Sequence, residues 1–271
     1  MSGKLYFVAT PIGNLMDTSF RQIETLKSVD VILCEDTRSS LKFLQKYEIK
    51  KSLESFHKFN YKKVSGNIID RLLNGTNFAL ITDAGTPCIS DPGSELISLL
   101  NENKIEYTII PGACAFVNAF ALSGFKMPCT FLGFLPNTKK EIDVMLENVK
   151  NVNSTLIFYC SPHSLKEDLK TLYKYFGDKK CCSVRELTKI YEEIEYFNLF
   201  EGYSKEPKGE YVLLIENFND KQNELNDLSV LEHYNYYIQL NYEKNDAIKQ
   251  VAKDRKVAKN IIYNEIVNIL K

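Results

Sequence analysis

The chain of 271 residues lacks the features that mark several common classes of protein. It has no apolar run of about 18 residues, the length of a membrane span, and its first residues, Met1-Ser2-Gly3-Lys4, lead directly into a strand-like segment. We therefore expect neither a signal peptide nor a membrane span. Its 34 basic residues nearly balance 35 acidic ones. This balance excludes a globally basic nucleic-acid-binding protein, so any RNA contact must come from a local patch.

Patterns of metal ligands and disulfides are also missing. The seven cysteines form no C-x-x-C pair, and most of them lie in apolar runs. The three histidines, His57, His163 and His233, are scattered along the chain. We therefore expect no metal site, and we expect buried, reduced thiols, as in a cytoplasmic protein.

Neither glycine-rich phosphate fingerprint, G-x-G-x-x-G or G-x-x-x-x-G-K-[ST], occurs in the chain. Instead, two stiff loops each follow an apolar run: Thr10–Asn14 follows Leu5–Ala9, and Asp83–Gly93 follows Phe78–Ile81. Ligands of α/β sheets bind at the carboxyl ends of strands. Because the loops carry prolines and a carboxylate, a neutral or cationic ligand fits better than a phosphate. Ordinary turns are the alternative.

The first half of the chain alternates between strand-like and helix-like segments. This alternation implies parallel strands with crossover helices on both faces. The predicted strands are 5–9, 29–33, 53–56, 78–81 and 107–110, and the predicted helices are 19–27, 41–47, 64–73 and 95–103.

A second pattern begins after Pro111-Gly112. A helix of small residues is predicted at Ala113–Ser123, and the later strands follow one another with few helices between them, which indicates a mixed sheet with antiparallel pairing. We therefore predict an α/β protein with two domains, 1–112 and 113–218, and a cleft between them. The further strands are 130–134, 155–159, 181–185, 191–197 and 211–215, and the further helices are 139–149 and 165–176.

Residues 219–271 form a separate tail in this prediction. Asn219–Asp227 reads as a polar linker, and two helices follow at Asp246–Lys253 and Val257–Leu270, the first capped by Asn245. Six basic residues face two acidic ones between positions 244 and 259. This basic turn either contacts RNA phosphates or is a solvated face of a helix pair.

Six motifs occur in an order known from one family. Through them the chain resembles, over residues 4 to 218, the ribosomal RNA small subunit methyltransferase I branch of the tetrapyrrole-methylase-like family. The resemblance implies S-adenosylmethionine as cofactor, 2'-O-methylation of a cytidine ribose in 16S ribosomal RNA, a homodimer, and a cofactor site in the cleft between two α/β domains. The motifs are Thr10–Asn14, Glu35–Arg38, Asp83–Pro87 with Ser90–Gly93, Gly133–Pro136, Arg185–Lys189 and Lys208–Glu210.

The resemblance also implies which residues contact the cofactor. Pro11 lies beneath the nucleoside, the second loop lines the methionine side, and further contacts come from the predicted second domain. Asp83 either hydrogen-bonds the cofactor's ammonium or a ribose hydroxyl, or caps its own turn. The remaining implied contacts are Ala84, Gly85, Thr86, Ile89, Cys114, Ala115, Cys160 and Leu187.

Methyl transfer to a hydroxyl also requires a base and residues that bind and orient the substrate. Lys189 with a lowered pKa, or Glu210, is the candidate base, and a structural lattice of ion pairs is the alternative for both. Arg38 either faces an RNA phosphate or pairs with a neighbouring carboxylate. The other candidates for substrate binding are His57, Asn60, Arg185 and Lys208.

The chain departs from the family's pattern at three positions. Relatives often carry a second His where this chain has Phe59, and they tend to carry Glu where it has Cys160 and Arg where it has Ser164. Loss of that Arg shifts the expected RNA contacts toward Arg38, Arg185 and Lys189. Two other functions remain open. One is methylation of a porphyrin-like small molecule on the same fold, and the other is a non-catalytic RNA-binding assembly factor.

Overall fold

A computed structural model describes residues 2–218, 225 and 228–269. The chain forms two compact units, one running to Asn217 and the other beginning at Phe218, and each is described by itself. In these ranges, no helix has both the length and the apolar character needed to cross a bilayer. The predicted linker 219–227 lies, apart from Leu225, outside the described residues.

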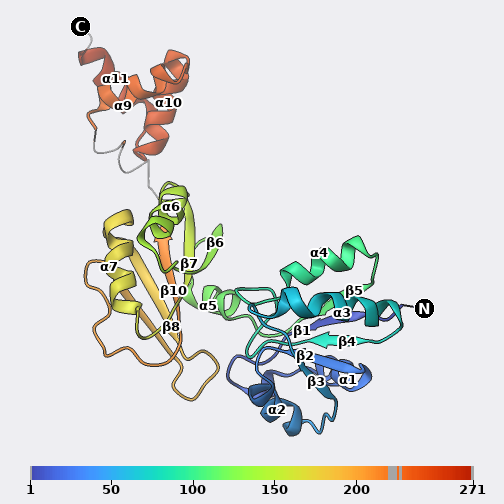
Figure 1. Ribbon diagram of the computed structural model, residues 1–271. Coiled ribbons are helices and arrows are strands. Elements are labelled where there is room, and N and C mark those ends of the chain that lie inside the picture. The colour runs from blue at the N-terminus through green and yellow to red at the C-terminus, as the bar shows by residue number, and fades with distance from the viewer. Residues whose placement is uncertain (1, 219–224, 226–227, 270–271) are drawn as a thin grey trace. The chain divides into compact units, whose positions relative to one another are not determined.

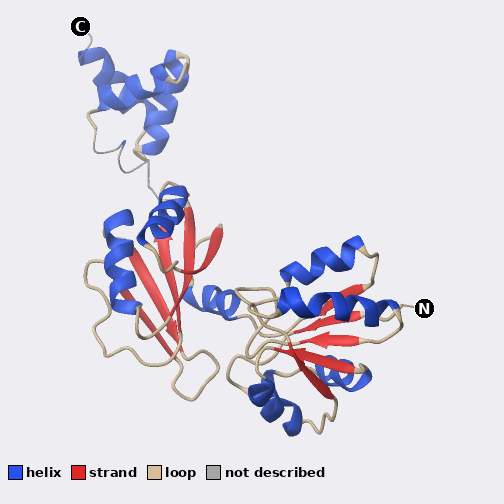
Figure 2. Ribbon diagram, viewed as in Figure 1, coloured by secondary structure: helices blue, strands red, loops and turns tan. Residues whose placement is uncertain are grey.

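The first unit contains two sheets, and the first of them is fully parallel (Figures 1 and 2). Its strands are short and mostly buried, and the parallel arrangement predicted from the alternating pattern is confirmed. In spatial order the strands are β3 (Ser52–Ser55), β2 (Val31–Cys34), β4 (Phe78–Leu80), β1 (Leu5–Val8) and β5 (Tyr107–Ile110).

Helices cover both faces of this sheet (Figure 1). On one face, Leu26, Phe43 and Leu44 pack against the strands, and on the other Ile68 and Leu96 do so. The first face carries α1 (Phe20–Ser28) and α2 (Thr37–Lys46), and the second carries α3 (Tyr61–Leu73) and α4 (Ser94–Glu102); a short 3-10 helix, η1 (Leu15–Asp17), precedes α1.

The strand order creates a crevice between β1 and β4, which are hydrogen-bonded neighbours. The connection from β1 leaves through α1 on one face, and the connection from β4 leaves through α4 on the other. The loops after these two strands therefore diverge from adjacent points on the carboxyl edge. A crevice at such a reversal is where open α/β sheets bind ligands.

The second sheet is mixed, as predicted, with one parallel pairing and three antiparallel ones. Leu146 and Leu169 pack on one face, and Ala119 of α5 (Ala115–Ser123) packs on the other. The spatial order is β6 (Cys129–Phe134), β7 (Ser154–Cys160), β10 (Tyr211–Asn217), β8 (Lys180–Arg185) and β9 (Glu193–Asn198), and the helices on the first face are α6 (Lys139–Val149) and α7 (Leu165–Phe176). The division into domains at residue 112 stays a prediction.

The strand predicted to begin at Tyr191 begins at Glu193. The residues before it form turns, because Glu186 and Thr188 both adopt left-handed backbone conformations, with φ of 50° and 67°. Neither conformation is compatible with a continuous strand. The segment between β8 and β9 is therefore a loop that projects from the end of the sheet.

The second unit has three described helices, one more than predicted: α9 (Val230–Gln239), α10 (Lys244–Asp254) and α11 (Lys259–Ile269). The missed helix begins with a capping box formed by Ser229 and Glu232. The predicted cap of α10 at Asn245 is wrong, because Glu243 is the N-cap residue. Burial lowers the pKa of His233, although its hydrogen bond to Asp254 acts in the opposite direction.

Gln22 connects the ends of β1 and β5. Its side chain is 1% exposed and donates hydrogen bonds to the carbonyls of Ala9, at 2.8 Å, and Pro111, at 3.4 Å. The Gln22 amide nitrogen lies 2.3 Å from where a Cβ on Gly112 would be. The absence of a side chain at Gly112 thus lets one amide hold two loops of the carboxyl edge.

We predict that Gln22→Leu lowers the free energy of unfolding by about 1–3 kcal/mol, since buried carbonyls lose their donor. Urea unfolding measures this change. Gln45→Leu on the exposed face of α2 is the control and is expected to change the free energy by less than about 0.5 kcal/mol. Equal effects of the two substitutions would show that Gln22 does not hold the loops.

Candidate active site

Three loops at the carboxyl edge of the first sheet are bonded to one another. The backbones of Thr10 and Gly85 exchange two hydrogen bonds, of 2.8 and 3.1 Å. The Thr86 hydroxyl donates to the carbonyl of Ala113 at 3.0 Å, which adds the loop after β5. Thr82, rather than Asp83, stabilises the second loop's turn, because its hydroxyl donates to the Gly85 carbonyl at 3.2 Å.

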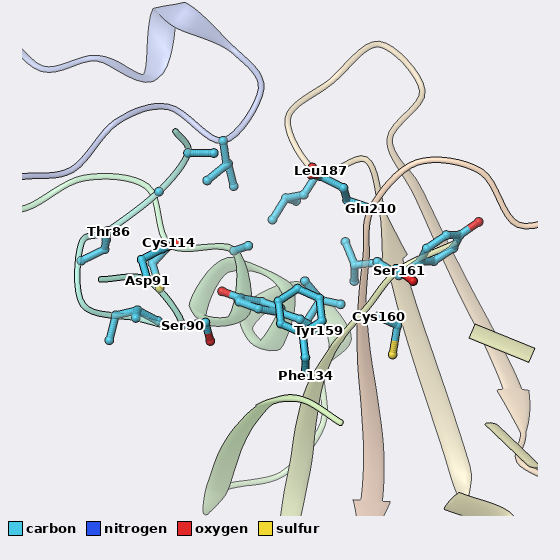
Figure 3. A pocket seen from close by; sticks show the side chains of 18 of the residues that line it. Thr86, Ser90, Asp91, Cys114, Phe134, Tyr159, Cys160, Ser161, Leu187 and Glu210 are labelled. Carbon is cyan, nitrogen blue, oxygen red and sulfur yellow. The ribbon is translucent and has the colours of Figure 1, made fainter. Parts of the chain in front are cut away.

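A cavity of about 450 Å³ opens over these loops, within the size range of small-molecule sites. Its lining comes from the loops of the first sheet on one side and from strands of the second sheet on the other (Figure 3). Nine of the ten residues predicted to contact a cofactor line it: Asp83, Ala84, Gly85, Thr86, Ile89, Cys114, Ala115, Cys160 and Leu187. Pro11 instead lines a neighbouring hollow of about 330 Å³.

One wall of the cavity is aromatic. Phe134 and Tyr159 both line it, and their ring centroids lie 5.5 Å apart in an edge-to-face arrangement (Figure 3). The ring of Phe131 also packs against Tyr159, with ring centroids 4.9 Å apart. Burial raises the pKa of Tyr159 to about 12, so its hydroxyl stays protonated at neutral pH. The wall therefore offers a flat apolar surface with a neutral hydroxyl.

The Lys189 side chain extends from the loop after β8 to Gly13, in the loop after β1. Its Cγ lies 2.4 Å from where a Cβ on Gly13 would be, so only a glycine there admits its stem. Its ammonium donates to Glu186 and to Glu210, each at 2.9 Å. Burial alone lowers the pKa of Lys189, but these two hydrogen bonds outweigh it and raise the pKa above the usual value. The lowered pKa expected from the sequence is therefore wrong.

Asp91 also lines the cavity, and it has no role in the sequence-based prediction beyond its place in the Ser90–Gly93 motif. Burial, together with the nearby charges of Glu35 and Asp83, raises its pKa to about 7. Within the described residues, no hydrogen-bond donor or cation contacts its carboxylate. Its burial depends on packing between distant segments, which leaves no local signal in the sequence.

None of the five predicted substrate contacts lines the cavity. The Arg38 side chain is 89% exposed and pairs with Asp36 at 3.2 Å. His57 and Asn60 stabilise the turn before α3: the Asn60 side chain accepts from the His57 backbone at 2.9 Å and donates to the Ser55 carbonyl. This geometry supports a structural role for both.

Arg185 and Lys208, the other two, line a separate hollow of about 270 Å³ together with Glu186, Tyr191 and Gly209. The Arg185 guanidinium lies 3.2 Å from Glu193. Gly209 lets the chain pass close to Glu186, whose carboxyl carbon lies 2.5 Å from where a Cβ would be. Glu186 thus borders this hollow while its carboxylate binds Lys189 of the main cavity.

Cys160 replaces a charged residue of the implied pattern with a neutral one. Its side chain is buried, and burial raises the pKa of its thiol well above the usual value. Nearby, the Ser164 hydroxyl donates to Asp168 at 2.7 Å. All seven cysteines are free thiols, and within the described residues no cluster of acidic, histidine or cysteine side chains is arranged to hold a metal.

The lining fits S-adenosylmethionine, the cofactor that the resemblance implies. A sulfonium cation needs anionic or aromatic surroundings, and the cavity supplies Asp83, Asp91 and Tyr159. Its single lining cation among the described residues, Lys189, is paired with two carboxylates. Gly85, at φ +86°, leaves open a space near Ile12 that a side chain would enter.

Comparison with known proteins gives consistent matches. A family model described as Tetrapyrrole (Corrin/Porphyrin) Methylases matches residues 4–201. A protein from Halalkalibacterium halodurans named ribosomal RNA small subunit methyltransferase I is 43% identical over 271 residues, covering 97% of this chain and 94% of that protein. Its namesake from Bacillus subtilis is 40% identical over 272 residues, covering 97% and 93%.

Solved structures with the same fold have far more distant sequences. A diphthine synthase has a TM-score of 0.64 at 13% identity, covering 79% of this chain and 90% of its own. A uroporphyrin-III-C-methyltransferase from Thermus thermophilus has a TM-score of 0.56 at 15% identity, covering 82% and 98%. These similarities show the arrangement of the two sheets and nothing of the substrate.

We predict that Gly85→Val weakens binding of S-adenosylmethionine at least about tenfold, a loss of about 1.4 kcal/mol. The Cβ of the introduced valine would lie 3.3 Å from Cγ2 of Ile12, so the valine side chain would enter the space beside Ile12. Gly202→Val is the control, because Gly202 also has a positive φ, +69°, but no atom lies within 4 Å of the new Cβ. Calorimetric titration compares the two, and equal affinities would place the cofactor elsewhere.

Proposed function

Because the chain belongs to the tetrapyrrole (corrin/porphyrin) methylase family and, within it, to the ribosomal RNA small subunit methyltransferases I, we propose that it methylates RNA of the small ribosomal subunit. The acceptor that we propose is the 2'-hydroxyl of a cytidine in 16S ribosomal RNA, and the donor is S-adenosylmethionine. One observation carries the proposal: the cavity at the β1–β4 crevice is apolar and anionic, with Lys189 at its mouth neutralised.

The cofactor, when bound, supplies an electrophilic methyl group on a positively charged sulfur. The three bonded loops bind its methionine and nucleoside portions, with Gly85 and Ala84 at the closest approach and Pro11 beneath the nucleoside. Cys114 and Ala115 begin α5 beside Thr86, whose hydroxyl holds their loop. Leu187 and Cys160 close the cavity from the second sheet. Together they exclude water from the reacting centre.

Basic groups around the cavity are the proposed RNA contacts: Arg38 and Lys208 are exposed, and Arg185 is partly buried. Arg38 lies in the first turn of α2, whose residues Ser39 and Lys42 line the same hollow as Pro11. Arg185 and Lys208 line the other hollow. A strand passing over both hollows would cross the mouth of the main cavity, because Glu210 and Lys189 line both the first hollow and the cavity. His57 and Asn60 are proposed to support this surface through the turn before α3.

Lys189 and Glu210 are proposed to act at the cavity mouth. Since the pKa of Lys189 is raised, its ammonium persists at neutral pH and donates hydrogen bonds instead of removing protons. The Glu210 side chain is 80% exposed, so it can exchange Lys189 for a group of the incoming nucleotide. The two residues therefore orient the ribose.

We also propose that the protein is a cytoplasmic homodimer. Three exposed apolar side chains lie on or next to α5, and we propose that a second copy of the chain covers them. The residues are Val117, Leu122 and Met127, with exposed fractions of 50%, 44% and 68%.

Incubation with labelled S-adenosylmethionine tests the proposed activity. Small-subunit RNA, assembled small subunits and a porphyrin are offered as separate acceptors, and labelled RNA is digested to nucleosides. The expected product is 2'-O-methylcytidine. Label in the porphyrin alone would instead support a small-molecule methylase, and cofactor binding with no transfer to any acceptor would support an assembly factor.

We predict that Arg38→Ala weakens RNA binding and lowers its salt dependence by a slope of about 0.7, the value for one phosphate contact on a single strand. Affinity for S-adenosylmethionine is expected to stay at the wild-type value, because Arg38 is exposed and absent from the cavity lining. RNA binding is measured at several salt concentrations.

Lys27→Ala removes the same charge from the end of α1, at the opposite edge of the sheet, and serves as the control. It is expected to leave the salt slope unchanged. A loss of cofactor affinity in Arg38→Ala would place this residue in the cofactor site instead of the RNA surface.

We predict that a chain ending at Asn217 binds S-adenosylmethionine normally but methylates RNA poorly at low RNA concentration. The second unit would raise the effective concentration of RNA near the site without taking part in chemistry. Activity of the shortened chain is expected to recover as RNA is raised. Steady-state rates over a range of RNA concentrations measure this.

The matched variant keeps the second unit and neutralises its exposed lysines Lys253, Lys256 and Lys259 with alanines. Arg255 is left in place, because it binds His233 and the Leu228 carbonyl and so supports the helices. This variant should reproduce the loss. If it behaves as wild type while the shortened chain loses cofactor binding, the second unit is structural.

A further inference from the structure

Of the lining carboxylates that the structure describes in the cavity, Asp91 alone is both half-buried and without a cation. Glu210 binds Lys189 at 2.9 Å and is largely exposed, and Asp83 is exposed where the cavity meets the neighbouring hollow. A carboxylate held by an ammonium is a weaker base, since the cation favours its charged form. The arrangement leaves Asp91 available as a base inside the cavity.

The backbone around Asp91 is held in an unusual conformation. Cys88 and Ser90 adopt left-handed conformations, with φ of 68° and 62°, and Gly93 has φ of 135°. Such conformations cost free energy in residues other than glycine, and they persist where surrounding packing fixes them. Here the packing is tight, because a Cβ on Gly93 would lie 2.7 Å from the Cys88 sulfur.

The second sheet makes room for this segment. The register of β6 against β7 shifts between Phe131 and Gly133, and Gly133 has φ of +69°. A Cβ on Gly133 would lie 3.2 Å from the Ser90 hydroxyl. The glycine at this irregularity of β6 therefore leaves space for the Ser90 side chain. Asp91 therefore faces the cavity from a segment fixed by both sheets (Figure 3).

Resting on the proposed function, we propose that Asp91 is the general base that takes the proton from the RNA ribose hydroxyl during methyl transfer. The hydroxyl's O–H bond breaks as its proton passes to the Asp91 carboxylate. An oxygen electron pair forms the bond to the methyl carbon, while the carbon–sulfur bond breaks and its pair stays on sulfur. No further oxidant, reductant or ion is needed.

The surroundings of Asp91 suit this role. A base works best when its pKa lies near the working pH, and burial with the charges of Glu35 and Asp83 raises that of Asp91 to about 7. A carboxylate and a cationic sulfur both become neutral in the transfer. Loss of opposite charges is less costly in an apolar cavity than in water, where both charges would be solvated.

The titratable neighbours of Asp91 with a resolved pKa shift are two thiols and a phenol. Burial raises the pKa of Cys88 to about 11 and that of Tyr159 to about 12, and it also raises the pKa of Cys114. The remaining charged neighbours, Glu35, Asp83 and Glu95, are carboxylates. A pH dependence that disappears when Asp91 is replaced therefore belongs to Asp91.

The test compares Asp91→Asn with Asp83→Asn in single-turnover methylation of small-subunit RNA at saturating cofactor, from about pH 5.5 to 9. The wild-type rate should rise with pH and level off once the base is ionised, below the value of about 7 for the empty site, because the bound sulfonium favours the charged carboxylate. Asp91→Asn should lose about 10²–10⁴-fold in rate, together with the pH dependence. Asp83→Asn should weaken cofactor binding and keep a pH-dependent rate, with the midpoint moved to lower pH because one of the charges that raise the pKa of Asp91 is removed.

A binding measurement gives a second readout that does not depend on turnover. In wild type, the preference for S-adenosylmethionine over the uncharged S-adenosylhomocysteine should increase as pH rises through about 7, because the ionised Asp91 attracts the sulfonium. Asp91→Asn should show a preference that is independent of pH. Calorimetric titrations with each compound at several pH values give both affinities.

Several outcomes would overturn the proposal. A variant Asp91→Asn with wild-type rate and pH profile shows that another group is the base. A rate loss matched by an equal loss of cofactor affinity, with the pH profile kept, makes Asp91 a cofactor contact only. If wild type itself binds no cofactor and methylates no RNA, it is the proposed function that fails.

Discussion

The backbone pairing of Thr10 with Gly85 is the interaction on which the site depends. It bonds the loops after β1 and β4, the two strands between which the direction of winding reverses. The Thr86 hydroxyl adds a hydrogen bond to the loop after β5. The Gln22 amide donates to carbonyls at the ends of both β1 and β5 and so holds the two strand ends together. The floor of the cavity is therefore fixed by backbone and short side chains, so that it needs little reorganisation when a ligand binds.

The distribution of charge in the cavity follows from which carboxylates find a cation. Lys189 forms ion pairs with two carboxylates, Glu186 and Glu210, at the mouth of the cavity. Asp91 pairs with no cation of the described residues and is left inside with its pKa raised. An anionic ligand would be repelled by the negative charge there, whereas a cation would be attracted to it. The charge selectivity of the site thus arises from pairing as much as from composition.

Much of the architecture could be predicted because its signals are local. The strands of the first sheet are apolar runs that end in stiff loops, and the position of the loops at Thr10 and Asp83, each directly after a strand, is enough to predict a ligand site at this edge. The helix α9 was missed because its tyrosine-rich sequence is not typical of a helix. Its stability comes from packing against α10 and α11, which local propensity does not report.

The chemistry of individual side chains was harder to predict, because it depends on contacts between distant residues. The direction of the Lys189 pKa shift depends on Glu210, which is 21 positions away, and the role proposed for Asp91 depends on its burial against the second sheet. His57 and Asn60 look like a polar pair available for substrate, yet they bond to each other and to the preceding turn. Such outcomes are set by tertiary packing.

The most direct measurement of the central claim is a map of 2'-O-methyl marks on small-subunit ribosomal RNA, from cells with and without this gene. The account predicts that one cytidine loses its mark when the gene is deleted and regains it when the wild-type chain is supplied. An unchanged set of marks in the deletion strain would contradict it.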